Sequence, residues 1–486
     1  MKQKSIKINF IMNAILQMSS FIFPLITFPY ISRVLQPAGK GEVTFAISVI
    51  TYFSMFANLG IPTYGIRACA RVRDNKGDLT RVAHELLLIN LIMSVVSYGL
   101  LAIGIVAVPR LNESKTLLIV VSASILLNAI GMEWLYKALE QYTYITIRSV
   151  IFKGIAVIAM LLLVRSKDDG LIYGALSIFA ASASNILNFI NVHRYISLKP
   201  VGGLNLKRHL KPVFVFFAMA CATTVYTNLD TVMLGFMKTQ ADVGYYDAAV
   251  KVKTILVSIV TSLGSVLLPR ASYYIENDMP DEFRRITKKA INFVMIAALP
   301  LTVYFVLFAN EGIILLSGDA YIPAVGPMRI IMPTLIFIGL SNILGIQMLV
   351  PLGREKVVLF SEIAGAVVDL ILNALFIPKL GAAGAALGTL AAEAVVLLWQ
   401  YAALRRDVNK ALACVSYIRI LAALAAGCAS CIWVKLLDLG SFMTLLISAI
   451  LFFSIYIGLL YITKESFTRE VCDSLFRKIK RLLLRR

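Results

Sequence analysis

The feature that most constrains this chain is a series of long apolar stretches that recurs from one end of it to the other. About 20 consecutive apolar residues are enough for one helix to cross the hydrocarbon core of a bilayer. The polar segments between the stretches are too short to form a domain of their own. The pattern therefore predicts an all-α polytopic membrane protein with about fourteen transmembrane helices.

The composition agrees with this fold class. Hydrophobic residues make up 59% of the chain and charged residues only 15%, whereas soluble domains carry about 25% charged residues. The expected spans cover residues 9–32, 43–65, 83–108, 116–136, 145–164, 170–192, 212–236, 245–268, 290–309, 326–350, 357–378, 382–404, 415–436 and 441–463.

The basic residues predict the orientation of the chain. The 47 lysines and arginines are concentrated at both ends and in every second connecting segment. Because such residues gather on the cytoplasmic side, both termini are expected in the cytoplasm. The net charge of +20 then reflects topology. The basic tail suits anionic lipid headgroups, and nucleic acid is not expected as a partner.

Two stretches indicate an internal repeat. The segment from Gly41 to Arg67 resembles the segment from Gly244 to Arg270, and each runs from an outer glycine to an inner arginine. Six spans per repeat would give two lobes of the same topology, related by an axis along the membrane normal. The expected domains are an N-lobe (residues 1–211), a C-lobe (212–404) and a segment with the last two spans and the tail (405–486).

Polar side chains recur at helical spacing in four spans, where they predict a shared polar face. The stripe of the first span consists of Asn13, Gln17, Ser20, Pro24 and Thr27. The stripe of the eighth span consists of Lys251, Thr254, Ser258, Thr261 and Ser265. Asp247 lies one turn before Lys251 and is expected to pair with it. The candidate substrate-binding residues are Asn13, Gln17, Arg33, Arg67, Asn228, Asp230, Lys251 and Ser258. Ionisable groups inside a span are functional candidates, but serine and threonine also hydrogen-bond their own helix or a neighbour.

Acidic residues also occur inside the later spans. Glu362 and Asp369 share one face of the eleventh span, and Glu393 lies midway through the twelfth. A structural salt bridge and a site that couples transport to a proton or sodium gradient are both open interpretations. No GxxxxGK[ST] motif is present, so an ATPase is not expected. A bound cofactor or metal is not expected either. The run GAAGAALG (Gly381 to Gly388) is typical of close helix packing.

Three stretches resemble a known family. LITFPYISRVLQPAGKGEVTFAISVITYF followed by LGIPTYGIRACA is similar to the N-terminal signature of bacterial polysaccharide transporters. MEWLYKALEQYTYITIRSVIFK resembles their fourth-to-fifth-span segment. The segment from Gly244 to Arg270 and the run GAAGAALGTLAAEA resemble their second half. The chain thus resembles the Wzx-type flippases of the multidrug/oligosaccharidyl-lipid/polysaccharide superfamily.

The resemblance implies two six-helix lobes around a central cavity, as in MATE-like transporters, with two added helices and alternating access. It also implies that the protein lies in the bacterial cytoplasmic membrane and serves the export of a surface polysaccharide. The expected partners are an undecaprenyl-pyrophosphate-linked oligosaccharide, membrane lipids, and a polymerase or other export proteins.

Two alternatives stay open. An ion-coupled multidrug or metabolite antiporter of the same superfamily would favour acidic residues in its cavity, whereas Arg33 and Lys251 favour an anionic substrate. A membrane polysaccharide polymerase or a polyprenyl-linked glycosyltransferase would call for long external loops with catalytic residues. The external loops here are short, so no enzymatic activity is expected.

Overall fold

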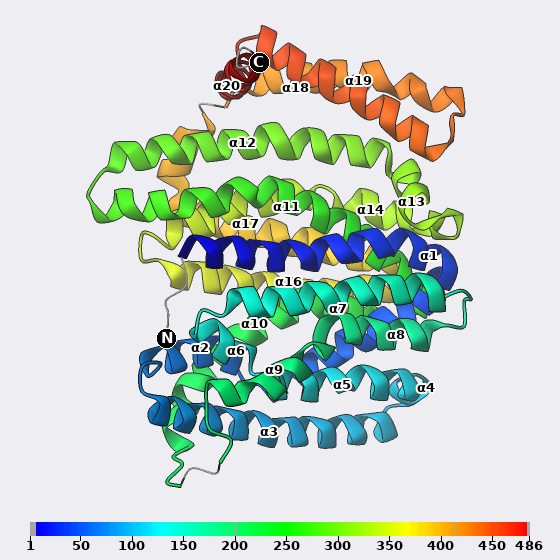
Figure 1. Ribbon diagram of the computed structural model, residues 1–486. Helices are drawn as coiled ribbons and strands as arrows, with labels where there is room; N and C mark the ends of the chain where they lie inside the picture. The colour runs from blue at the N-terminus through cyan, green and yellow to red at the C-terminus, as the bar shows by residue number, and fades with distance from the viewer. Residues whose placement is uncertain (1–5, 200–201, 414, 484–486) are drawn as a thin grey trace. The chain divides into compact units, whose positions relative to one another are not determined.

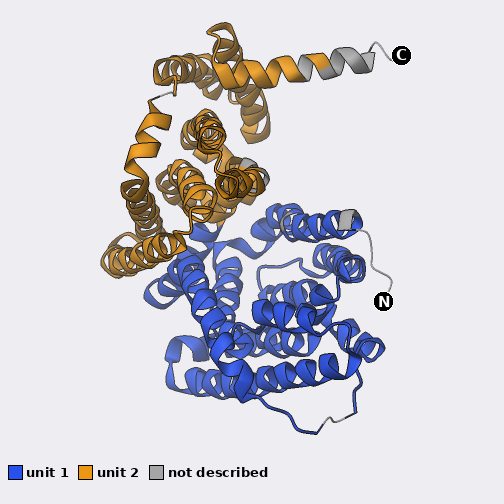
Figure 2. Cartoon of the chain, turned by 90° about the vertical axis from the view of Figure 1, so that its left-hand side faces the viewer, with its two compact units in different colours: residues 1–247 blue, residues 248–486 orange. Residues whose placement is uncertain are grey.

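The computed structural model describes residues 6–199, 202–413 and 415–483, and within those residues the chain is helical and contains no strand (Figure 1). It divides into two compact units, residues 1–247 and residues 248–486 (Figure 2). The boundary falls inside one long helix, α11 (Gln240–Glu276). The division into lobes at residues 211 and 404 stays a prediction.

Among its described residues, the first unit contains twelve helical elements before α11, and several of them are short. They are α1 (Ile6–Asn58), α2 (Ile61–Arg71), α3 (Lys76–Ala107), α4 (Pro109–Glu113), α5 (Lys115–Gly131), α6 (Glu133–Ala138), α7 (Tyr142–Leu163), α8 (Gly170–Ile178), η1 (Phe179–Ala183), α9 (Asn185–Asn191), η2 (Val192–Arg194) and α10 (Lys207–Met237).

The second unit continues from α11 to the end of the described chain. Its elements are α12 (Pro280–Leu307), α13 (Ala309–Ser317), η3 (Asp319–Ala324), α14 (Val325–Ile331), α15 (Thr334–Asn342), η4 (Ile343–Leu349), α16 (Glu355–Leu380), α17 (Ala382–Leu412), α18 (Tyr417–Cys431), η5 (Ile432–Leu437), α19 (Gly440–Ile462) and α20 (Ser466–Leu483).

The helices confirm the predicted membrane fold. Among the described residues, eleven helical segments are long and apolar enough to cross a membrane, and two further helix pairs, bent by 40° and 45°, meet the same criterion when each pair is taken together. The first segment holds two predicted spans, because α1 alone has 53 residues. The two helices that α1 joins at a kink have a combined length of about 80 Å at 1.5 Å per residue, more than twice the thickness of the hydrocarbon core. Each of the fourteen predicted spans therefore has a helical counterpart.

The break in α1 lies at Gln36, whose backbone leaves the helical region at φ 59° and ψ 171°. Pro37 follows directly, and a proline disfavours the helical conformation of the residue before it. The chain therefore turns between the first two spans, and α1 bends where the sequence predicts an outer connection (Figure 1).

The two glycines that begin the predicted repeat lie against each other's helices within the first unit. A Cβ atom on Gly41 would lie 1.8 Å from the Gln240 carbonyl oxygen, and one on Gly244 would lie 2.2 Å from the Pro37 carbonyl oxygen. Only glycine permits this approach of two backbones. The contact explains why both segments carry glycine at the same point, while the superposition of whole lobes stays a prediction.

An ion pair beside this contact corrects one expectation from the sequence. Asp247 lies 3.1 Å from the Lys40 ammonium, and both side chains are largely buried. The predicted partner of Asp247 was Lys251, one turn further along the same helix. The bend of α1 brings Lys40 to the start of α11, so the ion-pair partner of Asp247 is a residue distant in sequence.

A closed group of charged residues, which we call the Glu85 cluster, ties α2, α3 and α10 together. The Glu85 carboxylate is fully buried and bonds to the Arg208 guanidinium, to His209 Nε2 at 2.7 Å and to the Asn205 amide at 2.7 Å. His209 Nδ1 in turn lies 2.8 Å from the Tyr64 hydroxyl. Both carboxylate oxygens are thus hydrogen-bonded, which compensates for the cost of burying the charge.

In the second unit, α16 and α17 turn back on each other at Gly381 and pack closely. A Cβ atom on Gly384 would lie 2.5 Å from the Phe376 carbonyl oxygen, and one on Gly388 would lie 2.3 Å from Asn373 Oδ1. The interpretation of GAAGAALG as a close-packing sequence is confirmed.

Candidate functional site

The first unit contains a partly open cavity of about 440 Å³ between α1, α6, α7, α8 and η1. All of these elements belong to the first six predicted spans. The polar and charged residues of its lining are Gln17, Ser20, Thr27, Glu133, Lys137, Ser149, Lys153, Tyr173 and Ser177. Apolar lining residues include Phe23, Val157 and Met160, so the cavity presents an apolar wall beside a polar one.

The polar wall includes most of the stripe predicted on the first span. Gln17, Ser20, Pro24 and Thr27 all line the cavity, as expected for residues that share one helix face. Asn13, one turn nearer the N-terminus, is half-buried and is not among the lining residues. The role of Gln17 and Asn13 in binding stays a prediction.

Lys153 of α7 reaches across the cavity to α1. Its ammonium donates hydrogen bonds to the hydroxyls of Ser19 and Ser20, both at 2.9 Å. These hydroxyls donate in turn to the Leu16 carbonyl, at 2.7 Å and 3.3 Å. Among the described residues, no carboxylate lies within ion-pair distance of Lys153. Because an ammonium group has three N–H donors, one donor and the full positive charge stay available at the cavity.

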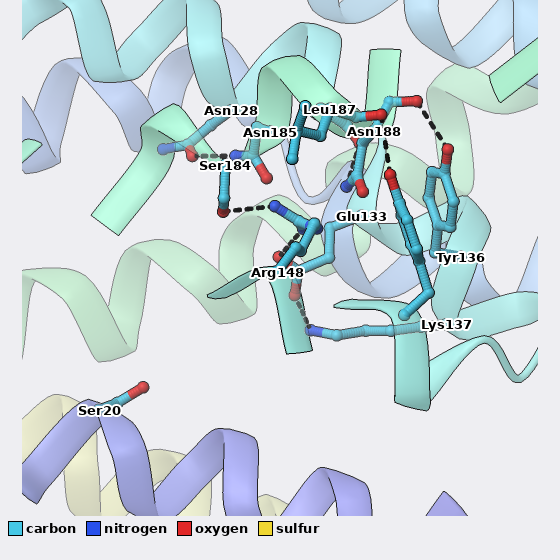
Figure 3. A network of polar contacts seen from close by, with 12 residues as sticks. Ser20, Asn128, Glu133, Tyr136, Lys137, Arg148, Ser184, Asn185, Leu187 and Asn188 are labelled. Atoms are coloured by element: carbon cyan, nitrogen blue, oxygen red, sulfur yellow. Dashed lines mark hydrogen bonds and ion pairs between the residues drawn. The ribbon is translucent and has the colours of Figure 1, made fainter. Parts of the chain in front are cut away.

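A second group of charges lies at the end of the cavity formed by α6 (Figure 3). Glu133 opens α6 and pairs with Lys137 one turn on, at 2.8 Å. This order of acid and base suits both the helix dipole and the i,i+4 spacing. The other carboxylate oxygen lies 3.4 Å from Arg148 of α7. We call Glu133, Lys137, Arg148 and Lys153 the cavity cluster.

Arg148 is the buried member of the cavity cluster, since only 4% of its side chain is exposed. Besides Glu133, its guanidinium bonds to the Ser184 hydroxyl at the start of α9 (Figure 3). It therefore joins α6, α7 and α9. Arg148 positions Glu133, while the more exposed Lys137 and Glu133 face the cavity.

Amide side chains behind the cavity cluster hold α9 against α5 and α6 (Figure 3). Asn185 donates to Asn128 Oδ1 at 3.0 Å, and Asn188 donates to the Gly131 carbonyl at 2.8 Å. The Tyr136 hydroxyl donates to the Asn188 carbonyl at 2.6 Å. The last two bonds satisfy the carbonyls of Gly131, where α5 ends, and of Asn188 in α9. Backbone groups inside a membrane need such partners.

The charges of the cavity are predominantly positive. Among the described residues of its lining, Lys137 and Lys153 stand beside a single acid, Glu133. An anionic group would gain a charge-assisted hydrogen bond from Lys153, and the serine, threonine and glutamine side chains supply neutral donors and acceptors. The geometry thus suits a ligand with an anionic part and many hydroxyl groups.

The other predicted binding residues of the first unit lie outside the lining of this cavity. Arg33 is exposed and donates to the Pro29 carbonyl of its own helix at 2.9 Å. Arg67 is exposed on α2. Asn228 donates to the Thr224 carbonyl at 3.2 Å and to the Thr227 hydroxyl at 3.0 Å. Asp230 is buried and accepts a hydrogen bond from the Tyr246 hydroxyl.

The predicted residues of the eighth span lie in the second unit. Lys251 is half-buried, and Ser258 is exposed and donates to the Ile255 carbonyl at 2.6 Å. That bond within the helix matches the alternative interpretation of stripe serines. The side chain of Ser265, at the end of the stripe, lies outside the described residues.

The predicted coupling residues differ in how deeply they are buried. Glu362 is half-buried, whereas Asp369 and Glu393 are almost fully buried. A Cβ atom on Gly388 would lie 2.9 Å from Asp369 Oδ1, so this acid lies directly beneath the close contact of α16 and α17. No group of three His, Cys, Asp or Glu residues that could hold a metal ion occurs among the described residues.

Sequence reasoning missed the cavity cluster. Its four residues lie in MEWLYKALEQYTYITIRSVIFK, which carries the family resemblance but no polar stripe. Arg148 and Lys153 lie inside a predicted span, and an ionisable residue in a span is a functional candidate by default. That rule, applied to the fifth span as it was to the eighth, would have found both.

The chain is similar to known transport proteins. A relative from Escherichia coli (strain K12) carries the name "Putative O-antigen transporter" and is 25% identical over 413 residues, or 84% of this chain and 99% of the relative. The solved structure titled "Lipid II flippase MurJ, inward closed conformation" has a TM-score of 0.71 at 16% identity, with 95% of this chain and 100% of that chain covered. An inward-facing multidrug resistance MATE family transporter has a TM-score of 0.63 at 13% identity, over 82% of this chain and 99% of that chain.

Two family profiles match the sequence. The profile described as "MatE" matches residues 216–375, and the one described as "Polysaccharide biosynthesis protein" matches residues 6–275, more than half of the chain. The second match includes the whole cavity and agrees with the resemblance drawn from the sequence. This multi-pass membrane protein belongs to the polysaccharide biosynthesis protein family.

Proposed function

We propose that the protein is a flippase that moves undecaprenyl-pyrophosphate-linked oligosaccharides from the inner to the outer leaflet of the bacterial cytoplasmic membrane. It works by alternating access, with both termini in the cytoplasm, and a polymerase or other export proteins act on the product. Family membership, the named relative and the transporter fold all support a role in moving a lipid-linked glycan.

The observation that carries the proposal is Lys153. It lines the cavity, is held by two hydroxyls, and has no carboxylate within ion-pair distance among the described residues. A cation left uncompensated inside a span is costly, and the pyrophosphate of the substrate would compensate it. The cost of keeping Lys153 charged in the empty protein then becomes part of the affinity for an anion.

The neutral wall of the cavity suits the sugars. A hydroxyl transferred into hydrocarbon without a hydrogen bond costs roughly 2–7 kcal/mol, so an oligosaccharide needs a polar route. Gln17, Ser149 and Ser177 offer donors and acceptors beside the apolar wall. The polyprenyl tail would stay in the lipid throughout.

The test is translocation of a labelled undecaprenyl-pyrophosphate oligosaccharide in proteoliposomes. We expect Lys153→Ala to lower the rate about tenfold or more, as for loss of a charge-assisted hydrogen bond, and Lys153→Arg to retain most of it. Lys253→Ala is the matched control, since Lys253 is also a half-buried lysine within a span. Equal rates for all variants would remove Lys153 from the mechanism, and no translocation by folded wild type would refute the flippase.

The cations predicted from the sequence belong to the same proposal. Arg33, Arg67 and Lys251 are proposed to meet the pyrophosphate at other stages of transport. Lys251→Ala, assayed beside Lys153→Ala, separates the two positions: loss in both variants supports two anion-binding steps, and loss in Lys153→Ala alone assigns the anion to the first unit.

Coupling to a proton or sodium gradient through Glu362, Asp369 and Glu393 is a further part of the proposal. The burial of Asp369 and Glu393 supports it, because ionisable residues within spans often mark ion pathways. Translocation by Asp369→Asn would be measured with and without each gradient. If the variant kept both its rate and its ion dependence, coupling through Asp369 would be excluded.

The MatE profile over residues 216–375 gives a reason to keep the antiporter as a second candidate. Its substrates would be cationic and would meet the acids of the second unit. Export of a cationic dye, lost in Asp369→Asn and unaffected by Lys153→Ala, would favour that function over the flippase.

A further inference from the structure

One end of the second unit carries two adjoining hollows that the proposed transport does not use. The larger, of about 510 Å³, lies between the end of α11, the start of α12, η4, the turn before α16 and the end of α17. The smaller, of about 240 Å³, continues it toward α20. Arg285, Lys288 and Ala411 line both hollows.

The floor of the larger hollow is apolar. Phe283, Met348 and Ala411 line it and are almost fully buried. Phe283 and Met348 belong to a packed cluster with Leu344, Leu404 and Val408. The floor is thus fixed by the core of the unit, and it offers hydrocarbon contact rather than hydrogen bonds.

The rim is charged, with more cations than anions. The lining includes Arg284, Arg285, Lys288 and Lys410 against Asp281 and Asp407. Arg284 and Arg285 pair with acids one turn back on α12, at 3.5 Å and 2.7 Å, in exposed positions. Exposed pairs of this kind are weak and leave the arginines able to exchange partners. Lys288 has no ion pair among the described residues, so the rim attracts an anion.

The position of the hollows identifies the occupant. They lie where α12 begins, immediately before the predicted span at residues 290–309, on the side that the lysine and arginine distribution assigns to the cytoplasm. This is the depth at which lipid headgroups meet acyl chains. A cationic rim above an apolar floor matches a molecule with a phosphate at one end and a hydrocarbon chain at the other.

We propose that this pair of hollows binds an anionic phospholipid of the cytoplasmic leaflet. The phosphodiester lies at Lys288 and Lys410, and the first part of an acyl chain lies on Phe283, Met348 and Ala411. The bound lipid joins the ends of α11, α12 and α17 and thereby stabilises the second unit. The site is distinct from the cavity of the first unit and does not depend on the transported substrate.

The test is native mass spectrometry of the full-length protein titrated with phosphatidylglycerol or phosphatidylcholine. We expect retention of phosphatidylglycerol in preference to phosphatidylcholine. Lys288→Gln/Lys410→Gln should weaken phosphatidylglycerol binding about thirtyfold, from about fivefold for each lysine near a headgroup. The matched control is Lys356→Gln/Lys464→Gln, which removes two exposed lysines of the same unit that line neither hollow.

A second variant tests the floor without changing charge. Ala411→Leu fills the point that both hollows share, and it should also lower phosphatidylglycerol binding, with thermal unfolding as the check on folding. Equal binding by the lysine pair and its control would overturn the proposal, whatever the outcome for Ala411→Leu. Lysine-dependent binding of water-soluble glycerol 3-phosphate at the same affinity would also overturn it, because the site would then serve a free phosphate compound.

Discussion

The Glu85 cluster and the cavity cluster lie in the same unit and use the same kinds of residue, yet their surroundings differ. The Glu85 carboxylate is fully buried, and each of its oxygens accepts hydrogen bonds from groups on other elements. Lys153 of the cavity cluster lies beside a hollow, and among the described residues its ammonium bonds only neutral hydroxyls. Residue type alone therefore does not separate a structural charge from a binding charge. The two are separated by their hydrogen bonds: the protein fills every hydrogen-bonding site of a structural charge and leaves one open on a binding charge.

The largest loss of stability is expected when the Glu85 cluster is broken. Glu85→Ala removes the partner of Arg208 and His209, and loss of one member of a buried pair costs about 3 kcal/mol or more. Unfolding of the solubilised protein measures it, with Lys153→Gln as the comparison. That variant should change the free energy of unfolding by less than about 1 kcal/mol, as is usual where no buried group loses its partners. Similar losses in both variants would remove the distinction between the clusters.

A smaller loss of stability is expected at the close contact of α16 and α17. It tests whether the polar residues there are tightly packed, like those of the Glu85 cluster. Gly388→Ala places a methyl group against Asn373 and Asp369, and overpacking of this kind costs about 1–3 kcal/mol. Gly458→Ala is the matched control, since nothing lies within 4 Å of a Cβ atom there. That change should be neutral, or stabilising by up to about 1 kcal/mol. If Gly388→Ala is as stable as its control, the buried acids lie in a looser environment than the contact indicates.

The smallest expected effect concerns the affinity of the cavity cluster for an anion. Glu133 is the single acid among the described residues that line the cavity, and two unit charges 4 Å apart in water interact by about 1 kcal/mol. Glu133→Gln should therefore raise the affinity for a polyprenyl pyrophosphate about two- to fivefold. The measurement is a titration of the purified variant, with Glu113→Gln, an exposed acid outside the lining of that cavity, as the control. A weaker affinity in Glu133→Gln would mean that Glu133 contacts the ligand or that Arg148 needs it for position.

The sequence predicted the spans well because hydropathy acts on each segment separately. Every expected span has a helix, and the stripe of Gln17, Ser20, Pro24 and Thr27 does line a cavity. Both results depend only on the period of one helix and the thickness of one membrane. Comparison of the two repeat segments identified Gly41 and Gly244 as equivalent positions. Their close contact depends on how the helices pack, which the sequence does not specify.

The partners of charged residues were not predictable in the same way. Asp247 pairs with Lys40 rather than with Lys251, and Lys153 bonds serines of α1 that are more than a hundred residues away. Such pairs depend on how helices pack, which helical periodicity does not specify. The same limit hid the cavity cluster, whose members come from two elements and become one site only when α6 and α7 meet.

The most direct test of the account is the affinity of the purified protein for undecaprenyl pyrophosphate and for undecaprenol, measured by native mass spectrometry. We expect wild type to bind the pyrophosphate more tightly than undecaprenol. Lys153→Gln should lose about tenfold or more of the affinity for the pyrophosphate, and Lys153→Arg should keep it. Binding of undecaprenol, which has no charge, should be the same in all three proteins. Equal affinity of wild type and Lys153→Gln for the pyrophosphate would contradict the assignment of the anion to this cavity.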